Sequence, residues 1–95
     1  MLKDIDLPRF EDADSIDNPM IVAHFNHPSG AEWWVVSGEE QLLVNNRKEL
    51  LLFGVAKITD TEMGVFALSE IENVGAVRDT DWTPQGLFDV FPQWR

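Results

Sequence analysis

The 95-residue sequence contains no cysteine and no tyrosine, and only 7 Lys and Arg stand against 17 Asp and Glu. Without cysteine the chain holds no disulfide, no thiolate nucleophile and no cysteine-ligated zinc. It has no apolar run near the ~20 residues that a membrane span requires, and its first residues lack the apolar core of a signal peptide. These absences predict a cytoplasmic protein that needs no oxidising compartment.

The charge balance restricts the class of partner. The formal net charge is −10, yet 44% of the residues are hydrophobic, so the chain has enough apolar side chains to fold. A strongly anionic surface repels phosphate backbones and anionic membranes, and it attracts basic proteins. We therefore expect the partner to be a basic protein surface, that of a nucleic-acid-binding host protein, and we expect no direct nucleic acid and no membrane. Solubility alone is the other use of such charge.

The length and the residue pattern predict one domain over residues 1–95, with an acidic N-terminal segment at 1–19 and a core at 20–91. Apolar, β-branched runs separated by turn residues predict two hairpins, at residues 20–37 and 50–68. The fold class is therefore α+β, an antiparallel sheet of about four strands with short N- and C-terminal helices.

Three local signals place the helices. Pro8 and Asn18-Pro19 bracket a short helix near residues 8–17. Ser69 and Glu72 have the spacing of a capping box, with Ser69 as the N-cap and Gly75 ending the turn. Thr83-Pro84 predicts the start of a C-terminal helix that Pro92 stops, with a buried stripe of Leu87, Phe88 and Phe91.

The sequence offers no recognisable catalytic set. His24 and His27 are its only histidines, and residues i and i+3 of a strand point to opposite faces, so they would not share a metal. The serines lack a nucleophile-elbow context and no glycine-rich phosphate loop is present. We expect a protein that is not an enzyme, with no cofactor and no metal site.

The four tryptophans are many for a chain of this length. Because Trp33 and Trp34 are adjacent in a strand, they face opposite sides of the sheet. Trp33, Trp34 and Trp82 are therefore either buried under the terminal helices or available as an aromatic anchor for a ligand.

Acidic residues recur in pairs separated by one residue. In an extended chain, the two side chains of such a pair lie on the same side of the strand, ~6.6 Å apart. A row of these carboxylates could stand in for the phosphates of a nucleic acid. A helix breaks this arrangement. The predicted partner-binding face consists of Asp12, Asp14, Asp17, Glu70, Glu72, Asp79 and Asp81.

Several blocks of residues carry a family resemblance. They are Pro28-Ser29-Gly30 before Trp33-Trp34, then residues 52–55, residues 62–72, Arg78-Asp79 and Trp82-Thr83-Pro84. In this order they resemble the domain of unknown function numbered twenty-nine fifty-eight, over about residues 20–90. The family usually has Trp-Tyr and then Thr-Glu where this chain has residues 35–38, and a Glu where this chain has Val77. The family carries no assigned activity, so the resemblance implies a context, small acidic proteins of plasmids, integrative elements and phages.

Two functions remain open at this point. The first is a non-catalytic acidic interaction protein of a mobile element or phage. It would inhibit a host nucleic-acid-handling or defence protein, in the manner of anti-CRISPR or anti-restriction proteins. The second is a small-ligand or peptide-binding module that uses an exposed tryptophan. A concavity lined by tryptophan favours the second, and a convex ridge of carboxylates favours the first.

Overall fold

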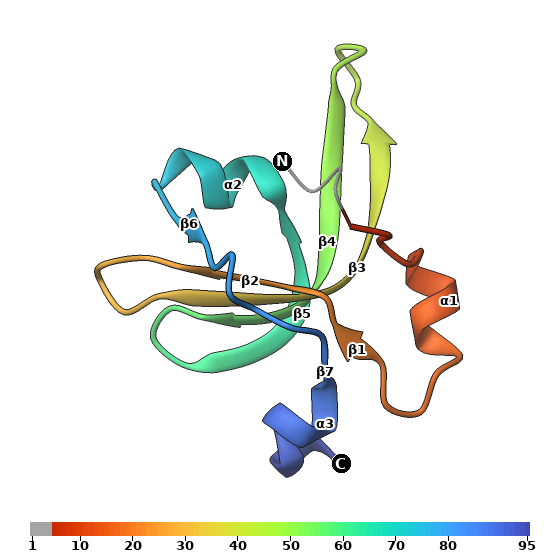
Figure 1. The fold of residues 1–95 in the computed structure, drawn as a ribbon. Helices are drawn as coiled ribbons and strands as arrows, with labels where there is room; N and C mark the ends of the chain where they lie inside the picture. The colour runs from red at the N-terminus through yellow and green to blue at the C-terminus, as the bar shows by residue number, and fades with distance from the viewer. Residues whose placement is uncertain (1–4) are drawn as a thin grey trace.

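A computed structural model describes residues 5–95 of the chain. In it, antiparallel strands form a five-stranded sheet in the order β5-β4-β3-β2-β6, and a separate strand pair joins β1 to β7 (Figure 1). The large sheet consists of β2 (Ala23–Asn26), β3 (Glu32–Leu42), β4 (Lys48–Lys57), β5 (Thr61–Ala67) and β6 (Val77–Arg78). The small pair consists of β1 (Met20–Ile21) and β7 (Gln85–Gly86). The predicted α+β class, with an antiparallel sheet and short helices, is confirmed.

Both predicted hairpins form. Strand β2 pairs with β3 from Ala23↔Val35 to Asn26↔Glu32, and β4 pairs with β5 from Leu51↔Ala67 to Lys57↔Thr61. The residues between the two hairpins are not a separate connection. Instead β3 and β4 run on to Leu42↔Lys48 and form a long arm, which rises beyond the helices in Figure 1.

The alternation of β3 creates two hydrophobic cores, one on each face of the sheet. Trp33 lies in the first, called here the Trp33 core, with Val35, Phe25 and Leu52. Trp34 lies in the second, the Trp34 core, with Val36 and Val55. Helix α2 (Leu68–Asn73) contributes Leu68 and Ile71 to the Trp33 core. Helices α1 (Phe10–Asp14) and α3 (Leu87–Val90) contribute Ala13 and Leu87 to the Trp34 core.

The capping-box prediction for α2 is wrong. The helix begins two residues earlier than predicted, at Leu68, and its N-cap is Ala67, which makes no side-chain cap. The Ser69 N–H instead donates to Glu49 Oε1 on β4, at 3.3 Å. The predicted end is confirmed, because Gly75 takes φ +79° and its N–H donates to the Glu72 carbonyl.

The predicted start of the C-terminal helix is also wrong. Residues Gln85 and Gly86 form β7, and α3 begins only at Leu87 with Gly86 as its N-cap. The Leu87 N–H donates to the Pro19 carbonyl, so pairing with β1 holds this segment extended where local signals favour a helix. Helix α3 ends before Pro92, which begins the 3-10 helix η1 (Pro92–Trp94). Leu87 and Phe91 are buried and Phe88 is half-buried.

None of the helices within residues 5–95 is both long and apolar enough to cross a lipid bilayer.

Candidate functional site

The most elaborate polar site surrounds His24, on β2. Its Nδ1 lies 2.9 Å from Asp79 Oδ2, and its Nε2 lies 3.0 Å from Glu32 Oε1. Lys57 Nζ lies 3.9 Å from the other Glu32 carboxylate oxygen. The imidazolium form donates to both carboxylates at once, whereas a neutral ring has one N–H and donates to one of them.

Two tryptophans enclose the same ring. The His24 ring is stacked on the Trp34 ring, with centroids 5.3 Å apart and planes at 27°. The Trp82 ring also lies against the His24 ring, with centroids 5.2 Å apart and planes at 40°. The side chain of His24 is thereby buried. Both ring nitrogens face carboxylates, so the ring is not placed to activate a nucleophile. We call His24 and its four contacting residues, Glu32, Trp34, Asp79 and Trp82, the His24 clasp. It joins β2, β3 and the segment after β6.

Asp79 takes its position from both side chain and backbone. The His24 hydrogen bond holds the pKa of the Asp79 carboxyl below its ordinary value, against the opposing effect of partial desolvation. The Asp81 N–H donates to Asp79 Oδ1 at 3.0 Å, and the Asp79 N–H donates to the His24 carbonyl at 2.8 Å. Of the predicted partner-binding residues, Asp79 is therefore committed to an internal contact, and Asp81 remains exposed beside it.

Of the two alternatives for Trp33 and Trp34, burial is the one that the structure shows. Their side chains fill the two cores and are only 7% and 8% exposed. Trp82 is half-buried, and its Nε1–H donates to the Ile21 carbonyl at 2.9 Å. Its ring fastens the segment after β6 to β1.

The acids of the predicted face do not share one surface. Helix α1, which carries Asp12 and Asp14, packs on the Trp34 core, and helix α2, which carries Glu70 and Glu72, packs on the Trp33 core. The sheet lies between the two helices (Figure 1). Sequence spacing could not reveal this separation, because the side of the sheet on which each helix packs depends on contacts distant in the chain.

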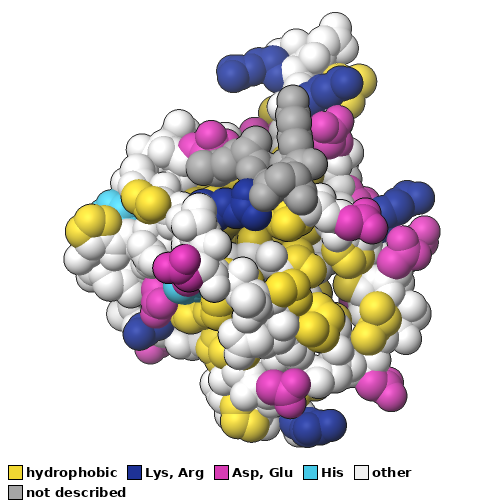
Figure 2. Space-filling model, in the orientation of Figure 1, with side chains coloured by type: hydrophobic (Ala, Val, Ile, Leu, Met, Phe, Trp, Pro, Cys, Tyr) yellow, Lys and Arg dark blue, Asp and Glu magenta, His cyan; other side chains and the backbone are white. Residues whose placement is uncertain are grey.

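The larger group of acids lies around α1, and we call it the α1 acidic patch. Its members are exposed carboxylates of helix α1, the loop after it and helix α3, namely Glu11, Asp12, Asp14, Asp17 and Asp89. Asp89 joins from the C-terminal end of the chain because Asn18 Nδ2 lies 3.4 Å from Asp89 Oδ2 and Asn18 Oδ1 accepts the Phe88 N–H. Figure 2 shows acidic side chains along the side of the molecule that carries α1.

Two features keep the patch anionic. Ala13, which faces the core, anchors α1, so the acids of the helix point outward. The neighbouring cation Arg9 has its Nε 3.6 Å from Glu39 Oε1, and that same carboxylate accepts the Phe10 N–H at 3.1 Å. Arg9 is thus paired with a carboxylate outside the patch. Glu11 and Asp12 also lie in the first turn of α1, where negative charge is favourable.

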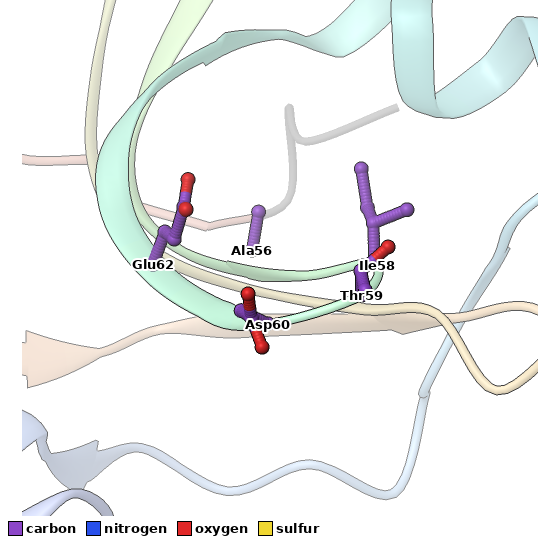
Figure 3. A pocket seen from close by; sticks show the side chains of 5 residues that line it. All are labelled: Ala56, Ile58, Thr59, Asp60 and Glu62. Atoms are coloured by element: carbon purple, nitrogen blue, oxygen red, sulfur yellow. The ribbon is translucent and has the colours of Figure 1, made fainter.

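A groove lies on the opposite face, over the Trp33 core. One cavity of about 200 Å³ is lined by His27, Ser29, Ala31, Trp33, Ile58 and Val74. A second, of about 230 Å³, is lined by Ala56, Ile58, Thr59, Asp60 and Glu62. The two share Ile58, and in Figure 3 the side chains of Ala56, Ile58 and Glu62 point to the same side of the β4–β5 hairpin. Each cavity is smaller than the ~300 Å³ at which pockets for drug-sized ligands begin.

Over residues 5–95, no group of three or more His, Cys, Asp or Glu side chains is arranged to hold a metal ion. His27 is occupied locally, since its Nδ1 lies 2.7 Å from Ser29 Oγ.

No protein-family model, curated protein or solved structure matches the chain. The resemblance drawn from the motif blocks stays a prediction.

Proposed function

We propose that the protein is a non-catalytic interaction protein that binds a basic protein surface through the α1 acidic patch. The observation that carries the proposal is the gathering of five exposed carboxylates on one side of the molecule, none of them paired with the nearby Arg9. On a chain of net charge −10 this patch attracts cations over distances near the Debye length, about 8 Å at physiological salt.

The class of partner follows from the same chemistry. Proteins that handle nucleic acid present Lys and Arg to phosphates, and surface carboxylates can occupy those cations in place of phosphates. The context implied by the family resemblance, plasmids and phages, favours a host defence or restriction protein. Occupying its cationic groove would exclude DNA or RNA and inhibit it.

The proposal is tested by affinity chromatography of a bacterial lysate on three immobilised proteins. They are the wild type, a patch variant (Glu11→Gln, Asp12→Asn, Asp14→Asn, Asp17→Asn) and a matched control on the other face (Asp60→Asn, Glu62→Gln, Glu70→Gln, Glu72→Gln). Both variants lose four charges, so a difference between them reports position and not net charge.

We expect a nucleic-acid-binding protein to be retained by the wild type and the control, and its affinity to fall about tenfold or more in the patch variant. The affinity should also weaken steeply with salt. Equal retention by both variants, or binding that is indifferent to salt, would contradict the proposal.

A second candidate function is supported by the groove over Trp33. Its first cavity is predominantly apolar, and Asp60 and Glu62 line the adjoining one. This combination suits an extended peptide with an apolar side chain next to a basic one. Selection of a displayed peptide library on the wild type, with counter-selection on Ile58→Glu, should yield such sequences. Peptides that bind both proteins equally would argue against the groove.

A further inference from the structure

Strand β5 forms a long edge of the sheet. All seven of its residues pair with β4 in one unbroken register, from Leu51↔Ala67 to Lys57↔Thr61. Within residues 5–95, no strand pairs with the other side of β5. Alternate residues of β5 thus direct their backbone N–H and C=O groups outward along this edge.

Natural proteins usually protect such an edge with a lysine, a proline, a bulge or a very short strand. Strand β5 has none of these, and Glu62 is its one charged residue. Met63 and Val65, on the Trp34 face, are 40% and 57% exposed. The opposite edge of the sheet differs, because β6 is only two residues long.

We propose that β5 is a self-association edge at which two copies of this chain pair antiparallel, with Gly64 facing Gly64 on a two-fold axis. This inference is independent of the proposed function. In that register Met63 of one copy faces Val65 of the other, and both exposed apolar pairs pack across the junction. Glu62 faces Phe66, so no carboxylate of the strand stands directly opposite its own copy.

The register is consistent with the backbone as well as with the side chains. In this register, odd-numbered residues pair with odd-numbered ones and even-numbered residues with even-numbered ones. The alternate residues of β5 whose backbone N–H and C=O groups point outward therefore pair with the same outward-pointing residues of the second copy. A Cβ at Gly64 would contact nothing within 4 Å, so space is available at the axis.

Pairing at β5 favours a closed dimer over a longer assembly. A two-fold junction uses the same edge of both copies and leaves no second β5 edge to extend the sheet. The two-residue β6 does not offer a comparable edge. The junction involves only the seven residues of β5 from each copy, so we expect a weak dimer that forms only at high protein concentration.

Sedimentation velocity over a range of concentrations provides the first test. Val65→Lys places a charge on the junction, and Val77→Lys makes the same change on β6 at a residue of similar exposure, 61% against 57%. We expect the dissociation constant to rise about tenfold or more for Val65→Lys and to stay unchanged for Val77→Lys. Equal effects, or a monomer at every concentration of the wild type, would overturn the proposal.

Salt separates this inference from the proposed function. Two copies of net charge −10 repel one another, so the dimer should strengthen between about 0.05 M and about 0.5 M NaCl. Binding of a basic partner should weaken over the same range. A dimer that weakens with salt would contradict the β5 junction without affecting the proposed partner.

The register is tested separately by disulfide formation. Because the chain has no cysteine of its own, only the introduced cysteines can form a disulfide. In Gly64→Cys the two cysteines lie across the axis, within the roughly 4.4–6.8 Å between Cα atoms that a disulfide needs. In Thr61→Cys each cysteine faces Ala67 of the other copy, far from its counterpart. Mild oxidation should produce a covalent dimer from the first and not from the second. Equal yields from both, or none from Gly64→Cys, would refute the register.

Discussion

At the scale of single residues, the His24 clasp is a contact that the local sequence around His24 does not predict. Its two acceptors, Glu32 and Asp79, lie 8 and 55 positions away along the chain. From strand alternation alone, the sequence predicts that His24 and His27 point to opposite faces of the sheet and would not share a metal ion. It contains no local signal that one of them lies between two carboxylates and two tryptophans.

The clasp predicts a specific dependence of stability on pH. Because the His24 hydrogen bond lowers the pKa of Asp79 in the folded state, the ionised carboxylate stabilises the fold above its ordinary pKa of 3.8. This contribution is lost as the pH falls through the lower, folded pKa. The melting temperature of Asp79→Asn should lie below that of the wild type at about pH 5, and the gap should close below pH 3.8. If the difference in melting temperature between the wild type and Asp79→Asn did not change with pH, the charge of Asp79 would not contribute to stability.

Two glycines face each other across β4 and β5, and they should respond to substitution in opposite ways. A Cβ at Gly54 would lie 1.9 Å from the Trp34 carbonyl oxygen, so β3 would have to move, whereas a Cβ at Gly64 meets nothing within 4 Å. Chemical denaturation of Gly54→Ala should show a loss of about 3 kcal/mol or more. Gly64→Ala should be neutral to within about 0.5 kcal/mol. Similar losses for both would contradict the close approach of β3 and β4.

At the scale of elements, hairpins were predictable and helix starts were not. The 50–68 hairpin follows from an apolar run, a polar turn and a second apolar run, all of which are local. Thr83-Pro84 and Ser69 are equally good local signals for a helix start, but tertiary pairing overrides them: β7 pairs with β1, and Glu49 reaches the first turn of α2.

The contact between Glu49 and Ser69 can be tested directly. Replacing the carboxylate weakens an acceptor for an N–H in the first turn of α2, where negative charge is favourable. Glu49→Ala should lower the free energy of unfolding by about 1 kcal/mol. Ser69→Ala should cost less, since Ser69 is not the N-cap.

The exposed residue Glu40, on β3, supplies the control for net charge. Glu40→Ala removes the same charge and should change stability by less than about 0.5 kcal/mol. If Ser69→Ala proved more costly than Glu49→Ala, a serine cap would be operating after all.

At the scale of the whole molecule, composition predicted the charge but not its distribution. The sheet separates the acids of α1 from those of α2, and it brings Asp89 to the α1 side from a distant part of the chain. The predicted single face therefore becomes a patch around α1 and a smaller group beside the groove. The α1 acidic patch and the groove over Trp33 lie on opposite faces of the sheet, so the two candidate functions use different parts of the molecule.

The most direct measurement of the central claim is displacement of a lysate's nucleic-acid-binding proteins from DNA-cellulose by the purified protein. We expect the wild type and the four-charge control on the groove face to release a specific basic protein. The α1 patch variant should require about tenfold more protein for the same release. Release of the same protein by all three at equal concentration, or release of nothing at low salt, would contradict the account.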